Sequence, residues 1–232
     1  MSIGDNVRAV RENIARAAEK AGRDLSEILL VAATKMNGAE RVREAVAAGV
    51  DACGENRVQE LVEKNALGAY AGAPLHFIGH LQKNKVNKLV GVCDLIQSVD
   101  SPELIAAIGR RAVLLGVTQN ILLEVNIAGE AQKSGVAPEG IWQLLDLAAE
   151  TAGISVQGLM TVPPICEKTE EIRGFFDRMY RLYVDIRAKK RDNVTMRFLS
   201  MGMSADYVEA IAAGANMVRV GSAIFGERDY NR

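Results

Sequence analysis

Short apolar runs alternate along this chain with stretches in which apolar residues recur every three or four positions. Such runs are typical of buried β-strands, and the recurring stretches are typical of amphipathic helices. The first stretch, residues 5–21, carries Val7, Val10 and Ile14 at helical spacing. Strands are expected after it at 27–34, 50–54, 75–79, 94–99, 121–127, 154–160, 196–202 and 216–222.

A helical segment is expected after each strand. Ser101-Pro102-Glu103, for example, places a capping serine before a proline at the first helical position. The other helices are expected over about 38–48, 56–67, 83–90, 138–151, the stretch containing Ile172 to Ile186, 204–213, and a last turn from Ser222.

The strands are apolar on both faces, as parallel strands covered by helices are. Eight strand-helix units without a linker predict a single (β/α)8 TIM barrel over residues 1–232, with an extra N-terminal helix. The alternative is an open doubly wound sheet, but no GxGxxG motif follows the first strand. The barrel is therefore the preferred architecture.

Composition and charge narrow the function classes. Twenty-eight basic and 29 acidic residues give a net charge of -1, so neither nucleic acid nor an anionic membrane is expected as the main partner. The basic clusters at 83–88 and 187–191 are short and are interpreted as solvated surface. Three cysteines without a CxxC motif, and no long apolar segment, indicate a cytoplasmic protein without a disulfide framework.

Polar residues recur where the predicted strands end, which is the working face of a (β/α)8 barrel. Lys35 ends the first strand, Asn56 follows the second, and His80 follows the third. Simpler interpretations exist for several residues at these strand ends. Asn56 and Ser204 could be helix caps, and Gly202 and Gly221 could be ordinary turn residues. Their shared location favours a site.

The loops after the seventh and eighth strands predict a phosphate cradle. SMGMSADYVEAI places Ser200, Met201 and Gly202 ahead of a helix, and RVGSAIFGER places Gly221 and Ser222 likewise. Glycine allows close backbone approach to an anion, and the free amides of a helix start point at it.

Lys35 and Arg219 are expected on neighbouring strands, because strand eight closes against strand one. A guanidinium inside a barrel needs an acceptor, which could be a buried carboxylate such as Glu124 or a ligand. Apolar surroundings and a nearby cation would both lower the pKa of Lys35 and expose a neutral amine. Pyridoxal 5′-phosphate (PLP) fits this arrangement, with its phosphate at the two loops, its aldehyde at Lys35 and its ring nitrogen toward Arg219.

The chain resembles the pyridoxal phosphate homeostasis protein family through a series of motifs. They are VAATK, GENRVQEL, LHFIGHLQKNK, LLEVNIAGEAQKSG, GLMTVPP and LSMGMSADYVEAIAAGANMVRVGSAIFGERDY. The resemblance implies a covalent imine between PLP and Lys35, a phosphate site at Ser200, Gly202, Gly221 and Ser222, and Arg219 facing the pyridine nitrogen. Asn56, His80 and Met203 match pocket-lining positions more loosely.

The resemblance also implies a role in vitamin B6 balance, in which PLP is bound and handed on without catalytic turnover. PLP-dependent apoenzymes are the expected recipients, and a monomer or weak dimer is expected. Racemases with this fold use a tyrosine base from a second domain, whereas this chain ends at Arg232. Of the tyrosines at 70, 180, 183, 207 and 230, only Tyr207 is expected near the working face. A PLP-dependent amino-acid racemase is the alternative, and a lysine-based aldolase acting on a phosphosugar is a third hypothesis.

Overall fold

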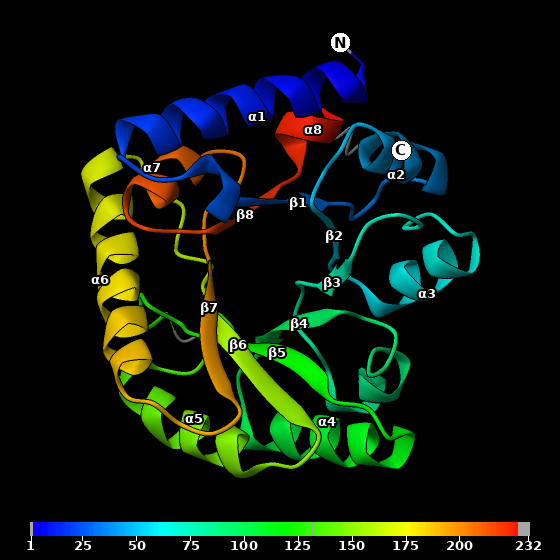
Figure 1. The fold of residues 1–232 in the computed structure, drawn as a ribbon, viewed down its shortest axis with the longest axis vertical. Helices are drawn as coiled ribbons and strands as arrows, with labels where there is room; N and C mark the ends of the chain where they lie inside the picture. The colour runs from blue at the N-terminus through cyan, green and yellow to red at the C-terminus, as the bar shows by residue number, and fades with distance from the viewer. Residues whose placement is uncertain (1, 131, 227–232) are drawn as a thin grey trace.

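The computed structural model describes residues 2–130 and 132–226 of the chain. In this part of the chain, eight parallel strands form a closed barrel in sequence order, with β8 hydrogen-bonded to β1 (Figure 1). The strands are β1 (Leu29–Ala33), β2 (Ala52–Glu55), β3 (Leu75–Phe77), β4 (Leu95–Val99), β5 (Gln119–Glu124), β6 (Ile154–Met160), β7 (Val194–Ser200) and β8 (Met217–Val220). The barrel predicted from the strand-helix alternation is confirmed.

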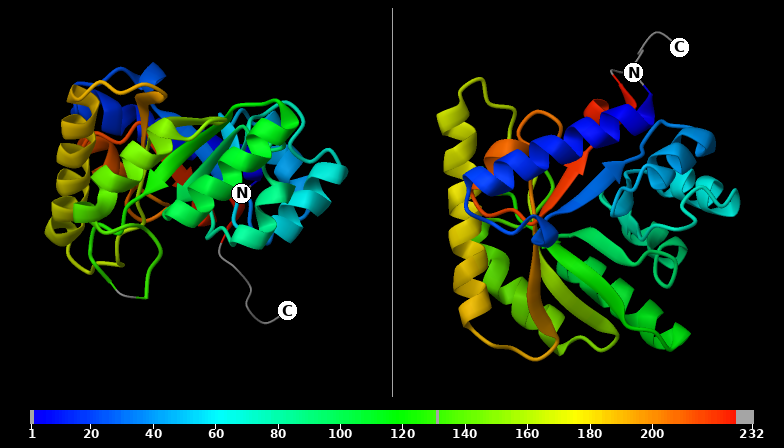
Figure 2. Two further views of the ribbon diagram at one scale, coloured as in Figure 1. Left: turned by 90° about the horizontal axis from the view of Figure 1, so that it is seen from below. Right: turned by 45° about the horizontal axis from the view of Figure 1, so that its top comes forward.

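The helices form an outer layer around the strands (Figure 1). The α-helices are α1 (Ile3–Lys20), α2 (Ala39–Ala47), α3 (Val58–Ala66), α4 (Pro102–Leu115), α5 (Ile141–Glu150), α6 (Thr169–Ala188), α7 (Tyr207–Ala212) and α8 (Ser222–Phe225). The 3₁₀ helices are η1 (Leu25–Glu27), η2 (Lys83–Lys88) and η3 (Pro138–Gly140). The N-terminal helix α1 crosses the outside of the barrel and packs against α2, α7 and α8 (Figure 2).

Two expected elements differ from the structure in ways that affect the site. The helix expected over 83–90 is the shorter 3₁₀ helix η2. The helix expected from Ser204 begins only at Tyr207, and β7 ends at Ser200. Between them, Gly202 has φ +93°, and a Cβ there would lie 2.5 Å from the Cβ of Ala210. This left-handed turn redirects the chain after β7 and keeps residues 201–206 as a loop.

The apolar core has two parts, one on each side of the barrel wall. The larger part lies between strands and helices, and it includes Ile14, Phe77 and Phe176. The smaller part fills the barrel interior with Val31, Ala52, Leu95, Leu122, Met160 and Met217. Among the residues that the structure describes, every helix is too short or too polar to cross a bilayer.

Candidate functional site

A cavity of about 600 Å³ lies at the carboxyl ends of the strands, the end of a (β/α)8 barrel at which sites are built. Its walls come from β1, the loops after β2, β3, β6 and β7, and the junction of β8 with α8. The lining residues are Ala33, Lys35, Asn56, Ile78, residues 162–169, Ile172, residues 203–206, Glu209, Arg219, Gly221 and Ser222.

Lys35 sits in a tight turn that directly follows β1 and is held on both sides. The amide of Asn37 donates to the carbonyl of Thr34 at 3.1 Å, and its side-chain amide donates to the carbonyl of Lys35, also at 3.1 Å. Met36 has φ +61°, an unfavourable conformation for a residue with a side chain. Its amide donates to Glu60 Oε2 at 2.7 Å, which secures that conformation. The turn therefore fixes the backbone from which the Lys35 side chain reaches the cavity.

Behind this turn lies a buried ion-pair network between β2 and α3. Lys64 Nζ is 2.7 Å from Glu55 Oε2 and 2.9 Å from Glu60 Oε2, and it also donates to the carbonyl of Thr34 at 2.9 Å. The Thr34 hydroxyl donates to Glu55 Oε2 at 2.9 Å, and the Tyr70 hydroxyl donates to the same oxygen at 3.2 Å. Glu55 and Lys64 thus bind Thr34 on one side of Lys35, and Lys64 reaches Met36 on the other side through Glu60.

Asn56 follows Glu55 at the end of β2 and lines the cavity beside Lys35. It is not a helix cap, because the N-cap of α3 is Arg57. Its Oδ1 atom is buried and accepts no hydrogen bond from any described residue. A buried acceptor without a donor costs about 1–3 kcal/mol, so this atom fits a site that a ligand donor completes.

Arg219 lies in β8 with its backbone paired to Val31 of β1 and its side chain buried. One guanidinium nitrogen donates to Ser200 Oγ at 2.6 Å and another to the carbonyl of Thr161 at 2.8 Å. Among the described residues, Arg219 does not form the ion pair with Glu124 that was one of its two expected interactions. Burial lowers the pKa of Arg219 to about 10, so its side chain is still a cation at neutral pH. Arg219 also reaches the cavity wall.

A line of polar side chains crosses the barrel interior and holds Arg219. The Ser200 hydroxyl donates to Gln97 Oε1 at 2.7 Å, and Gln97 Nε2 lies 3.0 Å from His76 Nδ1. Burial lowers the pKa of His76 to about 4, so the ring is neutral and its Nδ1 accepts from Gln97. The guanidinium therefore has a fixed position.

None of the three predicted cradle residues after β7 lines the cavity. Ser200 and Met201 are fully buried. The Ser200 side chain points into the barrel because it is the last residue of a strand whose side chains alternate. After the turn at Gly202 the chain reaches the rim, so Met203 and Ser204 are the residues of this loop that face the cavity.

Gly221 and Ser222 line the opposite side of the same rim. Ser204 does not cap α7, whose N-cap is Asp206. Its Oγ instead accepts from the amides of Gly221 at 3.0 Å and Ala223 at 3.4 Å. The Ser204 hydroxyl hydrogen is donated to no described residue and remains available to an acceptor in the cavity.

Other sequence candidates lie outside the cavity. His80 is exposed and does not line it. Tyr70 and Tyr207 are buried, and none of the four described tyrosines is part of the lining; Tyr230 lies outside the described residues. The described residues contain no cluster of histidines, cysteines and carboxylates suited to a metal ion.

Glu124 ends β5 in a desolvated position. Burial, and then the charge of Asp100, raise its pKa to about 7 from an ordinary 4.5. Its Oε2 atom is buried without a hydrogen-bond partner among the described residues. A protonated carboxyl group tolerates such burial better than a carboxylate does. Between about pH 4.5 and about pH 7 the folded state therefore holds a proton that the unfolded chain has lost, so Glu124 lowers the free energy of unfolding as the pH rises.

Glu124→Gln removes this titration. We expect the free energy of unfolding of Glu124→Gln, relative to wild type, to increase between about pH 5 and about pH 7.5, by at most about 1.4 kcal/mol per pH unit. Urea unfolding across this range measures the difference. Glu63→Gln, on the exposed face of α3, is the control. Its free energy of unfolding is expected to differ from that of wild type by the same amount at every pH in this range. A constant difference for Glu124→Gln as well would contradict the assignment.

Residues 6–229 match the family model of the alanine racemase N-terminal domain. A pyridoxal phosphate homeostasis protein of Aquifex aeolicus is 39% identical over 230 residues, covering 99% of this chain and 100% of the relative. A mouse protein of the same name is 36% identical over 244 residues, covering 100% of this chain and 89% of the relative.

A solved structure of PipY from Synechococcus elongatus with PLP bound superimposes with a TM-score of 0.80 at 32% identity. It covers 92% of this chain and 100% of PipY.

Proposed function

Since this chain belongs to the pyridoxal phosphate homeostasis protein family, we propose that it binds PLP in the cavity at the carboxyl ends of the strands and takes part in intracellular vitamin B6 balance. The observation that carries this proposal is the position of Lys35 on the wall of a cavity that also contains Arg219 and Ser222. The PLP-bound PipY structure supports it, since PipY has the same fold at 32% identity.

Lys35 is the residue to which PLP would be joined, as a covalent imine. Bound PLP supplies an electrophilic aldehyde, and Lys35 supplies the only nitrogen nucleophile that the backbone turn at residues 34–37 presents to the cavity. Arg219 can only donate hydrogen bonds, so it suits an unprotonated pyridine nitrogen. The unsatisfied Oδ1 atom of Asn56 fits a donor of the bound molecule or a water that it orders.

The phosphate site is proposed between the loop after β7 and the start of α8. Ser204 and Ser222 bring hydroxyls, and Gly221 lets the backbone approach because its position carries no side chain. Ser200 and Gly202 support this site indirectly, because Ser200 holds Arg219 and Gly202 turns the chain. Met201 is buried in the apolar core.

Two serine variants separate these roles. Ser204→Ala is expected to weaken PLP binding about tenfold or more, because a hydrogen bond to a charged acceptor contributes about 1.5–3 kcal/mol. Ser200→Ala leaves the cavity wall intact and is expected to lower the free energy of unfolding by about 1–2 kcal/mol, with a smaller loss of affinity. Titration of the cofactor-free variants with PLP, together with urea unfolding, measures both effects. An equal loss of affinity in the two variants would argue against the loop serine.

We expect binding without turnover, because no described tyrosine or histidine lines the cavity to act as a base at the α-carbon of a bound amino acid. The carboxylates that line it are those of Glu167, Asp206 and Glu209, and Asp206 accepts from the amide of Met203 at 2.6 Å. An amino-acid racemase is the alternative. Exchange of α-hydrogen in deuterium oxide with a panel of L- and D-amino acids decides between them, and rapid exchange would establish an enzyme.

PLP-dependent apoenzymes are the proposed recipients of the bound PLP. The protein is proposed to act in the cytoplasm, as a monomer or weak dimer. Residues 1–232 are proposed to form a single domain. The three unpaired cysteines, Cys53, Cys93 and Cys166, suit a reducing compartment. The test is to load the protein with PLP, remove excess cofactor, and add a PLP-free apoenzyme. Recovery of the apoenzyme's activity is expected. No recovery, with PLP retained on the protein, would limit the role to storage.

A further inference from the structure

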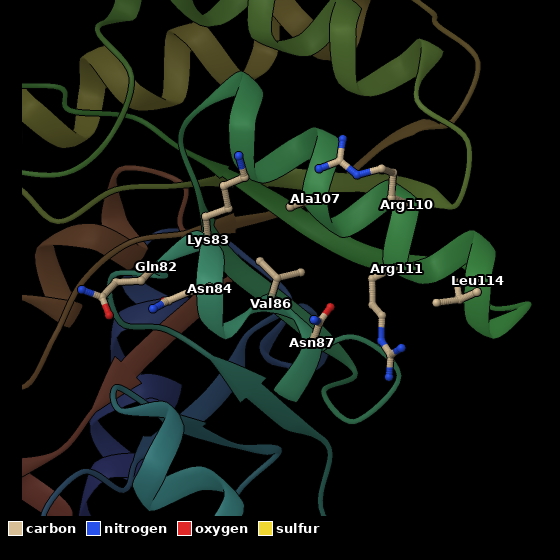
Figure 3. Close-up of a pocket in the computed structure, with 9 residues that line it drawn as sticks. All are labelled: Gln82, Lys83, Asn84, Val86, Asn87, Ala107, Arg110, Arg111 and Leu114. Carbon is tan, nitrogen blue, oxygen red and sulfur yellow. The ribbon is translucent and has the colours of Figure 1, made fainter.

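A second hollow, of about 750 Å³, runs along the side of the barrel between η2 and α4. We call it the lateral groove, and Gln82, Lys83, Asn84, Val86, Asn87, Ala107, Arg110, Arg111 and Leu114 line it (Figure 3). Val86 lies centrally, with Lys83 and Arg110 to one side of it and Arg111 beside Asn87 to the other (Figure 3). The lateral groove shares no lining residue with the cavity that contains Lys35.

All charged residues that line the lateral groove are basic. Its lining has three basic residues and no carboxylate, and η2 adds Lys85 and Lys88. Residues 80–93 and 104–123, which contain η2 and most of α4, include no acidic residue. Since the chain as a whole has a net charge of -1, this concentration of cations is balanced by acidic residues elsewhere.

The cations of the lateral groove lack internal partners. Within the described residues, none of Lys83, Arg110 and Arg111 forms an ion pair. The Arg111 Nε atom is, in addition, buried without a hydrogen-bond partner. A buried donor in this state costs free energy unless an external acceptor completes it.

Exposed apolar side chains continue the lateral groove at the end of α4. Leu114 is 76% exposed and lies one helical turn beyond Arg110. Leu115 is 41% exposed, and one of its methyl groups lies 3.2 Å from the position that a Cβ atom on Gly91 would occupy. Val92, the residue after Gly91, is 43% exposed. Clustered exposed leucine and valine next to unpaired cations are typical of a surface that another protein covers.

Nucleic acid, a membrane and a small anion fit this surface less well than a protein does. The basic residues of this groove come from η2 and one helix, α4. Nucleic acid binding usually requires a more extended basic face. A bilayer is flat and does not enter a hollow between two helices. Most lining side chains, including Gln82, Lys83 and Leu114, are exposed, so a small anion would remain largely solvated.

We propose that the lateral groove docks an acidic, leucine-containing helix of a partner protein. Carboxylates on one face of that helix would pair with Lys83, Arg110 and Arg111, and leucines on the adjoining face would pack on Val86 and Leu114. Because the lateral groove and the PLP cavity are separate, such a partner can be held while the cavity stays open. The inference goes beyond the proposed function and does not depend on PLP being bound.

Fluorescence anisotropy with a labelled synthetic helix tests the proposal. The probe carries glutamates and leucines at positions three and four apart, and a matched peptide has lysines in place of the glutamates. We expect the acidic peptide to bind, with an affinity that falls as salt is added, and the basic peptide not to bind. Hydrogen exchange is expected to show protection of residues 82–92 and 107–115 when the acidic peptide is bound.

Charge-reversal variants localise the binding. Arg110→Glu/Arg111→Glu is expected to weaken the acidic peptide at least about tenfold, and Leu114→Ser to weaken it to a lesser degree. Arg187→Glu/Lys190→Glu makes the same change in net charge on the basic cluster at the end of α6, and is expected to change the affinity less than about twofold. Circular dichroism checks that each variant is folded.

Several outcomes would overturn the proposal. These are no binding of the acidic peptide, equal weakening by both double variants, or protection elsewhere in the barrel. Tighter binding of a DNA duplex, or of phosphatidylserine vesicles, lost in Arg110→Glu/Arg111→Glu, would replace the protein partner with nucleic acid or membrane.

Discussion

Lys35→Ala protein is expected to be purified without PLP and to gain no imine absorbance when PLP is added. The lysine nitrogen is the proposed point of attachment, and alanine has no nucleophile to replace it. Affinity should fall at least about a hundredfold, because only the phosphate and ring contacts remain. Absorbance spectra of wild type and variant, before and after addition of PLP and gel filtration, measure both retention and attachment.

Lys168→Ala is the matched control, because Lys168 also lines the cavity but comes from the loop after β6. It is expected to keep the absorbance and most of the affinity. If Lys35→Ala and wild type had the same spectrum with PLP, or if Lys168→Ala were the variant that lost it, Lys35 would not be the attachment residue.

Lys64→Ala is expected to lower the free energy of unfolding by about 3–5 kcal/mol, because it leaves the Glu55 carboxylate buried without its cation. The side chains of Glu55 and Lys64 are 0% and 9% exposed, so water does not easily replace the lost partner. PLP retention should fall as well, since Lys64 holds the carbonyl of Thr34 and, through Glu60, the amide of Met36. Urea unfolding and PLP titration measure the two effects.

Two controls distinguish an unpaired charge from a simple loss of packing. Arg43→Ala breaks an exposed pair with Glu40 on α2 and is expected to cost less than about 1 kcal/mol. Glu55→Gln/Lys64→Met removes both charges and is expected to be more stable than Lys64→Ala. A Lys64→Ala protein as stable as wild type would show that the network does not support the Lys35 turn.

The fold was predictable because strands of a (β/α)8 barrel are apolar on both faces and regularly separated by amphipathic segments. The N-terminal helix was predictable for the same reason, from Val7, Val10 and Ile14, all of which are buried. The segment at 83–90 was less predictable. Its basic residues and Val86 are compatible with either an α-helix or a 3₁₀ helix, and the structure has a 3₁₀ helix that packs against α4.

The position of a site residue was predictable when the residue lies in a strand or directly after one. Lys35, Asn56, Arg219, Gly221 and Ser222 all line the cavity, and strand β8 does pair with β1. Their roles toward PLP stay predictions.

The loop after β7 was harder to predict, because one left-handed residue changes which side chains face the rim. A pattern of Ser, Met and Gly indicates a turn but does not show that Gly202 directs Met203 and Ser204, instead of Ser200, to the cavity. The Met-Gly-Met-Ser sequence at residues 201–204 was the available signal.

The network around Lys64 was also missed by sequence reasoning. A lysine in an amphipathic helix is normally solvated, and only the folded structure places its ammonium group between Glu55 and Glu60. The spacing of Glu60 and Lys64 by four residues was the only local signal.

The most direct test of the central claim is to reduce the PLP-loaded protein with borohydride, digest it, and locate the modified lysine by mass spectrometry. We expect the pyridoxyl group on the peptide that contains Lys35. Its presence on another lysine, or its absence from a protein that retains PLP, would contradict the claim that the turn after the first strand delivers the reactive amine.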